Sequence, residues 1–565
     1  MLSKRARLIL LVGIAAGVIG HCSLAQYATS RQQPLAYWLL YWSCVSVVAW
    51  QFPKTKARDQ KNGKVIFMFL LAVASLWCFL NVLECLYQSV SAVDGVDLFY
   101  YVCLARDRVW GYETSQVSVY TYFPGFFRFW QVIIFVFGSK LFVIQSAVIG
   151  LLLLNAILVC LIVKTTTKIW QLGLVGFALY VSFALRFEGL SGTSEPLATI
   201  GYLLGVWSWT ICKGYHRPKI SSILLGIGLG LALFCKEQAG LLSIGAVWLL
   251  FFSSKNQAVR SLVVDFGITA LTASFVFIVL ILLEGRGLFP LTTGLNTAMG
   301  YPAEWSWLRN IISQIRNDES LAWVSVLSIS GIAFSLFKTR VLTDREHEIC
   351  GLLVLSAIAT LVQFRSQGNF HYCLLAIPGF AAAFLIQATA YYRSIHSDCW
   401  KGRQKKIAIV MSVVLPFLYC GQRNVTLCFV DAECILGRIA PSRAWHETSE
   451  IANDLKEFER LVEPRSTMAI LPINRTAIYF RLNTVDPLGY AFSNRSAEIS
   501  STSEPIRFVV ALKPPMTRSE NIDWNGAECD KRLQNFIDHG YYPIAIGNRL
   551  KLLRAPFAFS EKQTK

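Results

Sequence analysis

Residues Val93–Asp107 read VDGVDLFYYVCLARD and belong to the first long segment that separates the apolar runs of the chain. The stretch is acidic at its start and aromatic in its middle. Asp97, Tyr101 and Ala105 follow one another at intervals of four residues, so a helix would place them on one face. Asp97 would then lie in the first turn, where the helix dipole favours a carboxylate.

The composition around this stretch is that of an integral membrane protein. The chain has 565 residues, of which 54% are hydrophobic and only 16% are charged, whereas roughly a quarter of a soluble chain is charged. The formal net charge is +18, but the basic residues form short clusters between apolar runs. That distribution is typical of topology determinants and excludes a nucleic-acid-binding surface.

Apolar runs long enough to cross a bilayer predict about thirteen membrane-spanning helices. They fall near 8–25, 35–51, 65–87, 141–163, 168–185, 193–212, 219–235, 238–254, 261–283, 321–337, 349–364, 372–391 and 406–421. The loop 54–64 is the strongest cytoplasmic signal, because it carries five basic residues and one acid. Placing it inside puts the other basic loops and the N-terminus inside as well. Residues 126–138, which include Arg128, are expected to form an interfacial or re-entrant helix.

Three regions are expected along the chain. Residues 1–64 contain two extra N-terminal spans and the basic loop, 65–425 form a transmembrane core with the large exported loop 88–140, and 426–565 form an exported soluble domain. In the last region, strands are expected at 467–471, 507–512, 542–546 and 550–554, with helices at 444–461 and 530–539. The expected fold is an all-α polytopic membrane protein with a small C-terminal exported α/β domain.

Ionisable residues at one membrane boundary are candidates for chemistry, because burying them is costly without a use. The predicted topology gathers polar and aromatic residues at the outer face: Asp94, Asp97, Tyr101, Arg106, Tyr122, Glu195, Lys236, Arg365, His371 and Tyr372. One carboxylate among several cations suits a reaction on an anionic lipid-phosphate donor. The carboxylate would deprotonate an acceptor hydroxyl, while Lys or Arg would hold the leaving phosphate.

Each of these residues also has an ordinary structural explanation. An Asp at a helix start is usually a cap, and a Lys at the end of a span usually extends its ammonium to the lipid head-groups. His371 and Tyr372 would be at home in an interfacial aromatic belt. The hypothesis of a site therefore depends on the gathering of these residues at one face.

These residues carry a resemblance to a known family. The pattern Asp97-x-x-x-Tyr101-x-x-x-Ala105-Arg106 resembles the first exported loop of the GT-C superfamily of glycosyltransferases, in the branch that contains protein O-mannosyltransferases and aminoarabinose–lipid A transferases. Four shorter stretches resemble later motifs of that family, in the same order: Tyr122-Phe123-Pro124-Gly125, Ser194-Glu195-Pro196-Leu197, Lys236-Glu237-Gln238 and His371-Tyr372. The resemblance covers roughly residues 65–425.

The resemblance implies a GT-C-like core and an enzyme that takes a sugar from a polyprenyl-phosphate carrier outside the cytoplasm. It makes Asp97 the candidate base. The candidate donor-phosphate and cavity residues are Lys236, Arg365, Glu195, His371, Tyr372, Tyr101, Arg106 and Tyr122. The chain departs from the family pattern in its two extra N-terminal spans and in Leu98, which follows Asp97 where relatives often have a second acid. Asp94 is therefore a second candidate for the base.

The expected partners are a polyprenyl-phosphate sugar donor, a lipid, glycan or protein acceptor, and membrane lipid. No cofactor is expected, and Asp94-x-x-Asp97 is too sparse to indicate a divalent metal site. The style of the chain favours a bacterial inner (plasma) membrane, with the C-terminal domain periplasmic or extracellular. Two alternatives stay open: a transporter or flippase for a lipid-linked glycan, and a scaffold that binds such a glycan without chemistry. The chain shows no internal repeat of the kind that transporters usually carry.

Overall fold

The part of the chain that the structure describes is mostly helical. The computed structural model describes residues 96–111, 124–187, 192–214, 218–252, 259–284, 319–337, 341–361, 370–395, 453–471, 481–484, 506–512 and 526–556, with 402, 404–406, 409, 413 and 478. The first three predicted spans lie outside the described residues, as does most of the last one. Asp94, Tyr122 and Arg365 lie outside them too.

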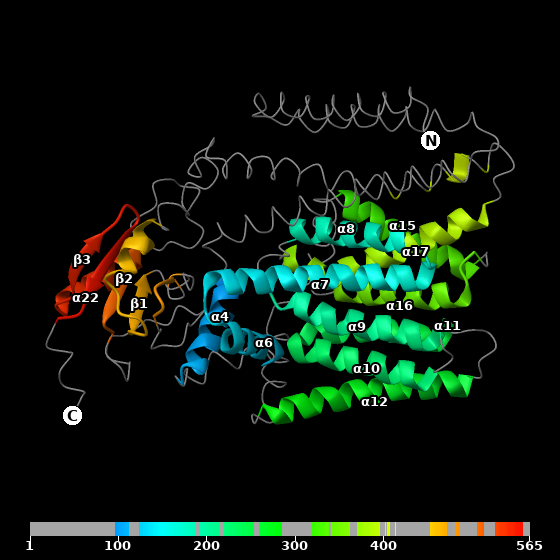
Figure 1. Ribbon diagram of the computed structural model, residues 1–565, viewed down its shortest axis with the longest axis horizontal. Coiled ribbons are helices and arrows are strands. Elements are labelled where there is room, and N and C mark those ends of the chain that lie inside the picture. Colours follow the sequence, from blue (N-terminus) through cyan, green and yellow to red (C-terminus); the bar gives the residue numbers. More distant parts are fainter. Residues whose placement is uncertain are drawn as a thin grey trace, which may run out of the picture.

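The long helices pack beside one another in a bundle (Figure 1). They are α7 (Leu141–Thr167), α8 (Trp170–Arg186), α9 (Glu195–Gly214), α10 (Pro218–Cys235), α11 (Ile244–Phe252), α12 (Val259–Leu283), α15 (Glu319–Phe337), α16 (Asp344–Thr360) and α17 (Ile377–Ser394). Every span predicted between residues 141 and 391 overlaps one of these helices, but the spans predicted at 238–254 and 372–391 each begin in a 3₁₀ helix. Within the described residues, two helical stretches are both long and apolar enough to cross a bilayer, Ser146–Thr167 and Val263–Leu283. The total of thirteen spans stays a prediction.

Close contact between α9 and α10 is made by glycines. A Cβ on Gly228 of α10 would lie 2.5 Å from the carbonyl oxygen of Gly201 and 2.6 Å from the Cα of Gly205, both on α9. Gly201 and Gly205 stand four residues apart and so share one helix face. Small residues at this spacing let two helix backbones approach closely, which is the main way helices associate in lipid.

The opposite side of α10 meets α12 in the same manner. A Cβ on Gly226 would lie 2.6 Å from the carbonyl oxygen of Thr269, and one on Gly230 would lie 2.7 Å from that of Ala273. The two contacts lie one helical turn apart on each helix. Helix α10 is therefore held between α9 and α12, and its C-terminal end has a fixed position.

A cluster of ion pairs joins α9, α16 and α17 at the end of α9 that is remote from Glu195. Lys213, in the last turn of α9, pairs with Glu348 of α16 at 2.5 Å. Glu346 pairs with Arg393 of α17 and also completes a capping box with Thr343 at the start of α16. The loops at 213–219 and 338–345 are both predicted to be cytoplasmic, and the structure brings residues that flank them to the same end of the bundle.

Helices α4 (Val96–Val109) and α6 (Pro124–Phe137) pack against each other between the bundle and the sheet in Figure 1. The spacing of Asp97, Tyr101 and Ala105 predicts a helix, and α4 confirms it. Pro124 is the first residue of α6, where a missing N–H costs nothing. The helix predicted at 126–138 is thereby confirmed as a helix, while its place at a membrane interface stays a prediction.

The C-terminal part forms a four-stranded sheet in the order β1-β2-β4-β3 (Figure 1). The strands are β1 (Met468–Leu471), β2 (Phe508–Leu512), β3 (Tyr542–Ile546) and β4 (Leu550–Arg554). Strands β1 and β2 run parallel, while β4 runs antiparallel to both of its neighbours. All four strands lie where the sequence predicts them, and α22 (Gly526–Asp538) begins four residues before the predicted helix at 530–539. Export of this region, and its standing as a separate domain, stay predictions.

The glycine contact makes a prediction about stability. Gly228→Leu would force α9 and α10 apart, because the new side chain would meet backbone atoms that cannot move aside. We expect a loss of about 3 kcal/mol of stability, at the upper end of the usual cost of overpacking. Thermal unfolding of the purified protein in detergent measures this loss of stability. Gly150→Leu on α7 is the matched control, since a Cβ there would meet nothing within 4 Å. An equal effect of the two variants would contradict the close approach.

Candidate functional site

Three interruptions of helical structure meet at one point in the bundle. Glu195 is the first residue of α9, Lys236 separates α10 from the 3₁₀ helix η2 (Glu237–Ser243), and Tyr372 belongs to the 3₁₀ helix η4 (Phe370–Leu375). The Lys236 Nζ lies 3.0 Å from the Glu195 Oε1 and 5.9 Å from the centroid of the Tyr372 ring. Glu195 has no exposed surface and Lys236 is 8% exposed. The three residues, from separate parts of the sequence, form a polar cluster in which the Glu195–Lys236 pair is buried and Tyr372 is partly buried.

The start of α9 is held in place by α7. Asn155, buried in the middle of α7, donates its Nδ2 to the carbonyl oxygen of Pro196 at 2.8 Å and to that of Leu151 at 3.1 Å. Pro196 stands just inside the start of α9, where its fixed φ suits a helix. Glu195 lies at the positive end of the helix dipole, which favours its carboxylate form.

Lys236 is placed by a break between two helices. Its backbone is extended, with φ −154° and ψ 127°, while its N–H still donates to the carbonyl oxygen of Ala232 at 3.1 Å. The η2 helix that follows is fixed from α16, because the Ser356 hydroxyl donates to the carbonyl oxygen of Leu242 at 2.7 Å. Gly245 allows this approach, since a Cβ there would lie 2.4 Å from the carbonyl oxygen of Leu352. The ammonium group therefore has a defined position.

The charge on Lys236 is retained despite burial. Burial alone lowers the pKa of a lysine, but the nearby carboxylates of Glu195 and Glu237 outweigh that effect and raise the pKa of Lys236 above its ordinary value. An ammonium has three N–H donors, and one of those of Lys236 points to the carboxylate of Glu195. A buried and oriented cation of this kind can stabilise negative charge on a ligand far better than a solvated one.

The first turns of α4 and α6 pack on the residues that lead into Glu195 and Lys236. Gly192, three residues before Glu195, has φ +66°, and a Cβ there would lie 2.5 Å from the Leu98 Cδ1. Leu98 directly follows Asp97 in α4. Gly125 in α6 packs equally closely on Phe234 of α10, because a Cβ on Gly125 would lie 2.7 Å from the Phe234 carbonyl oxygen. Phe234 precedes Lys236 by two residues, so both α4 and α6 begin beside the buried ion pair.

The structure brings some of the predicted site residues together. Lys236 lies close to both Glu195 and Tyr372. Tyr101 is buried, with its ring 4.8 Å from that of Phe126 in an edge-to-face contact. Asp97 lies in the first turn of α4 and His371 lies in η4, but their side chains lie outside what the structure describes, as do Asp94, Tyr122 and Arg365 altogether.

Arg106 is not placed with this cluster. It is buried and pairs with Asp107 at 3.0 Å, donates to the carbonyl oxygen of Thr484, and stacks on Trp110 at 4.4 Å. Five residues after Tyr101, it points about 140° away from the Tyr101 face of the helix. Its contacts join α4 to the C-terminal part of the chain, so it serves as an anchor for α4 in this structure.

Sequence reasoning missed the residues that position the cluster. Asn155 is the one with a visible signal, because it is a lone amide in a long apolar run, and such a residue in lipid needs a polar partner. Gly125 and Gly192 gave no such signal. Their value lies in what they contact, and that depends on the packing of helices distant in sequence.

Comparisons with known proteins identify the fold. No protein-family model matches the chain, and no curated protein matches its sequence. The structure matches that of ArnT from Cupriavidus metallidurans bound to undecaprenyl phosphate, with a TM-score of 0.53 and 10% identity over 90% of this chain and 100% of that one. The apo form of ArnT matches with a TM-score of 0.53 and 12% identity over 89% of this chain and 100% of that one. A weaker likeness, with a TM-score of 0.45 and 12% identity, is to the apo oligosaccharyltransferase of Archaeoglobus fulgidus, over 79% of this chain and 69% of that one.

The chain shares the fold of the ArnT structures. The resemblance predicted from short motifs is thereby confirmed at the level of the fold. The particular structure that carries this conclusion is ArnT, which this chain matches over the full length of ArnT.

The buried pair predicts a pattern of stability in single and double variants. Lys236→Met leaves the Glu195 carboxylate buried without its cation, and Glu195→Met leaves the ammonium without its nearest anion. Removing one partner of a buried pair costs about 3–5 kcal/mol, whereas replacing both by apolar residues is often close to neutral. We expect each single variant to unfold at a clearly lower temperature in detergent and the double variant to recover most of the loss.

An exposed ion pair serves as the control for this cycle. Arg507 and Glu463 in the C-terminal part lie 3.2 Å apart with more than half of each side chain exposed. Arg507→Met should change stability by less than about 1 kcal/mol, because solvent screens such pairs. A double variant at the buried site as unstable as its single variants would show that the two residues do not act as a pair.

Proposed function

We propose that the chain is a membrane glycosyltransferase that moves a sugar from a polyprenyl-phosphate-linked donor to a lipid, glycan or protein acceptor on the non-cytoplasmic face. The observation that carries the proposal is the buried Lys236 ammonium, fixed by Glu195 where three helix interruptions meet. The fold likeness adds support, because the ArnT structure holds undecaprenyl phosphate. The protein would span a bacterial inner (plasma) membrane many times, with its N-terminus inside and its C-terminal part exported.

Lys236 is the proposed contact for the donor phosphate. When the bond between the sugar C1 and the phosphate oxygen breaks, the bonding electrons leave with the phosphate, whose negative charge grows. A fixed cation in a water-poor site stabilises that charge without having to reorganise. Glu195 keeps the ammonium charged and oriented, and Tyr372 covers one side of it. Arg365 and His371 are proposed as further donor or cavity contacts from the same segment of the chain.

Asp97 is the proposed general base. The acceptor hydroxyl oxygen would form the new bond to C1 while its proton passes to the carboxylate. The backbone of Asp97 lies in the first turn of α4, and the next residue, Leu98, packs on Gly192 just before Glu195. This contact supports a base on α4 close to the donor cluster. Asp94, two residues before α4 begins, remains the second candidate for the same role.

A transporter of lipid-linked glycan is the second candidate function. The break between α10 and η2 supports it, because transporters often place charged residues at interrupted helices within the membrane. The two functions predict different products. A transferase yields a covalently modified acceptor, whereas a transporter moves the glycolipid across the membrane without changing it.

Substitution of the base gives the first test of the proposal. Asp97→Asn should lower transfer by roughly 10²–10⁴-fold, the usual contribution of a positioned base, while expression and membrane insertion stay normal. Mass spectrometry of membrane glycolipids and surface glycans, in cells with and without the protein, identifies the product and quantifies its loss. Asp94→Asn is the matched comparison, since the two variants remove the same charge three residues apart. If Asp97→Asn transfers normally and Asp94→Asn does not, the base is Asp94.

The double variant Glu195→Met/Lys236→Met tests whether the pair takes part in sugar transfer or only stabilises the fold. It should fold nearly as well as the parent protein and yet transfer no sugar, because the cation that faces the leaving phosphate is gone. The same mass-spectrometric assay, normalised to folded protein, measures it. Normal transfer by a folded double variant would remove Lys236 from the reaction. Unmodified glycolipid that still crosses the membrane would instead favour the transporter.

A further inference from the structure

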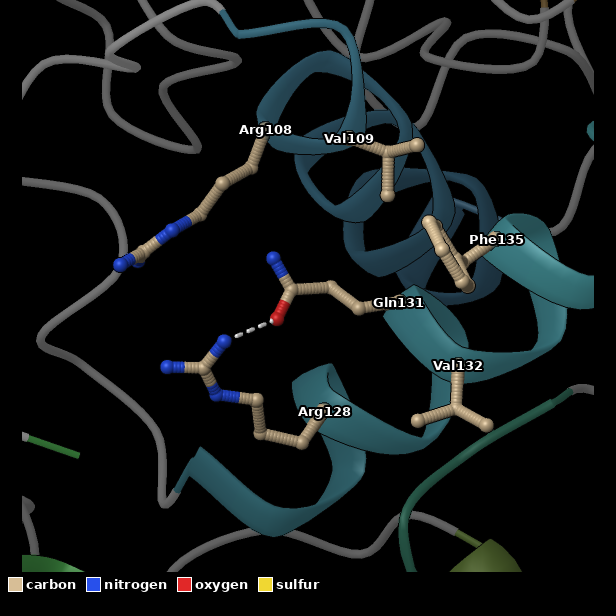
Figure 2. A pocket seen from close by; sticks show the side chains of 6 residues that line it. All are labelled: Arg108, Val109, Arg128, Gln131, Val132 and Phe135. Atoms are coloured by element: carbon tan, nitrogen blue, oxygen red, sulfur yellow. Dashed lines mark hydrogen bonds between the residues drawn. The ribbon is translucent and has the colours of Figure 1, made fainter. Parts of the chain in front are cut away.

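A second polar site lies on the outer side of α4 and α6. The end of α4 and the middle of α6 enclose an open cavity of about 420 Å³ (Figure 2). The residues that line it are Arg108, Val109, Arg128, Gln131, Val132 and Phe135. None of these residues contributes to the cluster around Lys236, which the first turns of the same helices approach.

The polar side of the cavity consists of hydrogen-bond donors. Arg128 donates through Nε and Nη2 to the carboxylate of Glu284, at 2.5 and 2.8 Å, and through Nη1 to the Gln131 Oε1 at 2.6 Å. The only side-chain acceptor of Gln131 is thereby occupied, and its amide NH₂ remains as a donor. In Figure 2 this amide lies beside the Arg128 guanidinium, and the Arg108 side chain reaches down the far side of the same opening.

The cavity carries one uncompensated positive charge within the described residues. Glu284 balances Arg128, whereas Arg108 is exposed and has no acidic partner in the part of the chain that the structure describes. An anion with a single negative charge would match this balance. Planar guanidinium groups suit phosphate oxygens in particular, because their N–H groups can donate in parallel.

The other side of the cavity is apolar and exposed. Val132 is 60% exposed and Phe135 is 80% exposed, and the face continues through Val136 and Phe137 to the end of α6. The opposite face of α6 is buried against the rest of the protein through Phe126 and other large side chains. A helix with one packed face and one exposed apolar face beside cations is suited to the boundary between lipid head-groups and acyl chains.

We propose that this cavity binds the phosphodiester head-group of an anionic membrane phospholipid. Arg108, Gln131 and Arg128 donate to the phosphate oxygens, and an acyl chain lies along Val132 and Phe135. The head-group charge of −1 matches the uncompensated charge of Arg108, and the apolar wall favours a lipid over a purely aqueous anion. The site is independent of sugar transfer, so it would hold α6 at the membrane surface whichever reaction the protein performs.

Binding of phosphatidylglycerol to the purified full-length protein tests the site. Native mass spectrometry of the protein in detergent, titrated with dioleoyl phosphatidylglycerol or dioleoyl phosphatidylcholine, gives the apparent Kd of each lipid. Arg108→Gln should raise the Kd for phosphatidylglycerol roughly tenfold, the typical value of one charge-assisted hydrogen bond, and abolish the preference over phosphatidylcholine. Lys140→Gln is the control, because it removes an exposed cation just beyond α6 that does not line the cavity.

Two further variants separate the contributions of head-group and chain. Phe135→Ser should weaken both lipids to a similar degree, while Gln131→Glu should weaken phosphatidylglycerol alone by placing a carboxylate beside the phosphate. Arg128 is left intact, because its loss would strand the buried carboxylate of Glu284. Unchanged phosphatidylglycerol binding in a folded Arg108→Gln variant would overturn the proposal. It would also fall if inorganic phosphate displaced the lipid and Phe135→Ser had no effect, since the cavity would then be a site for free anions.

Discussion

The buried contact between Glu195 and Lys236 is the interaction on which the arrangement of the site depends. A lysine and a glutamate inside an apolar bundle lose several kcal/mol of hydration each, and only a close, well-oriented pair regains it. Such closeness requires the start of α9 and the end of α10 to have fixed positions. The glycine contact of Gly228 with α9 brings the two backbones together, Asn155 holds the start of α9, and Ser356 holds the η2 helix that follows Lys236. The surrounding bundle is thus organised around one pair of charges.

The same physics explains why the cluster lies at helix interruptions. A helix in lipid satisfies all of its own peptide groups and offers none to a ligand, so polar chemistry has to occur where the helix starts, ends or changes type. Glu195 begins α9, Lys236 separates α10 from η2, and Tyr372 lies in a 3₁₀ helix ahead of α17. At the far end of α9, Lys213 and Glu348 also form a pair, but there a quarter of the lysine side chain is exposed. The two ends of one helix therefore differ in how well they shield charge.

Much of the fold follows from local sequence signals. Apolar runs predicted the helices of the bundle, short β-like runs predicted all four strands, and the spacing from Asp97 to Ala105 predicted α4. These signals are local because each depends on the period of one element. The site was predictable in part for the same reason. Charged residues at the ends of apolar runs stand out, and Glu195 and Lys236 do meet.

Other features depend on contacts between distant segments. The direction of Arg106 is an example: its neighbours in sequence suggest the same site as Tyr101, but helical rotation turns it toward Asp107 and Thr484 instead. The glycines at 125, 192 and 228 carry no chemistry, so nothing in their local sequence shows which backbone or side chain they contact. Such positions become interpretable only once the packing partner is known, because a missing side chain has no periodic pattern of its own.

Among the described residues, the cations at Lys236 and Arg108 have opposite surroundings. Lys236 is enclosed, so its field acts at low dielectric on whatever charge develops beside it, and that setting favours a change of charge during a reaction. Arg108 is exposed next to the apolar face of α6, so water and salt weaken its electric field. Its planar guanidinium can still donate hydrogen bonds to a phosphate whose acyl chain lies on that apolar face. The enclosed setting of Lys236 suits catalysis, and the exposed setting of Arg108 suits binding to the membrane. Because α6 begins at the packed contact with Phe234 and carries the open cavity farther along, one short helix links the two.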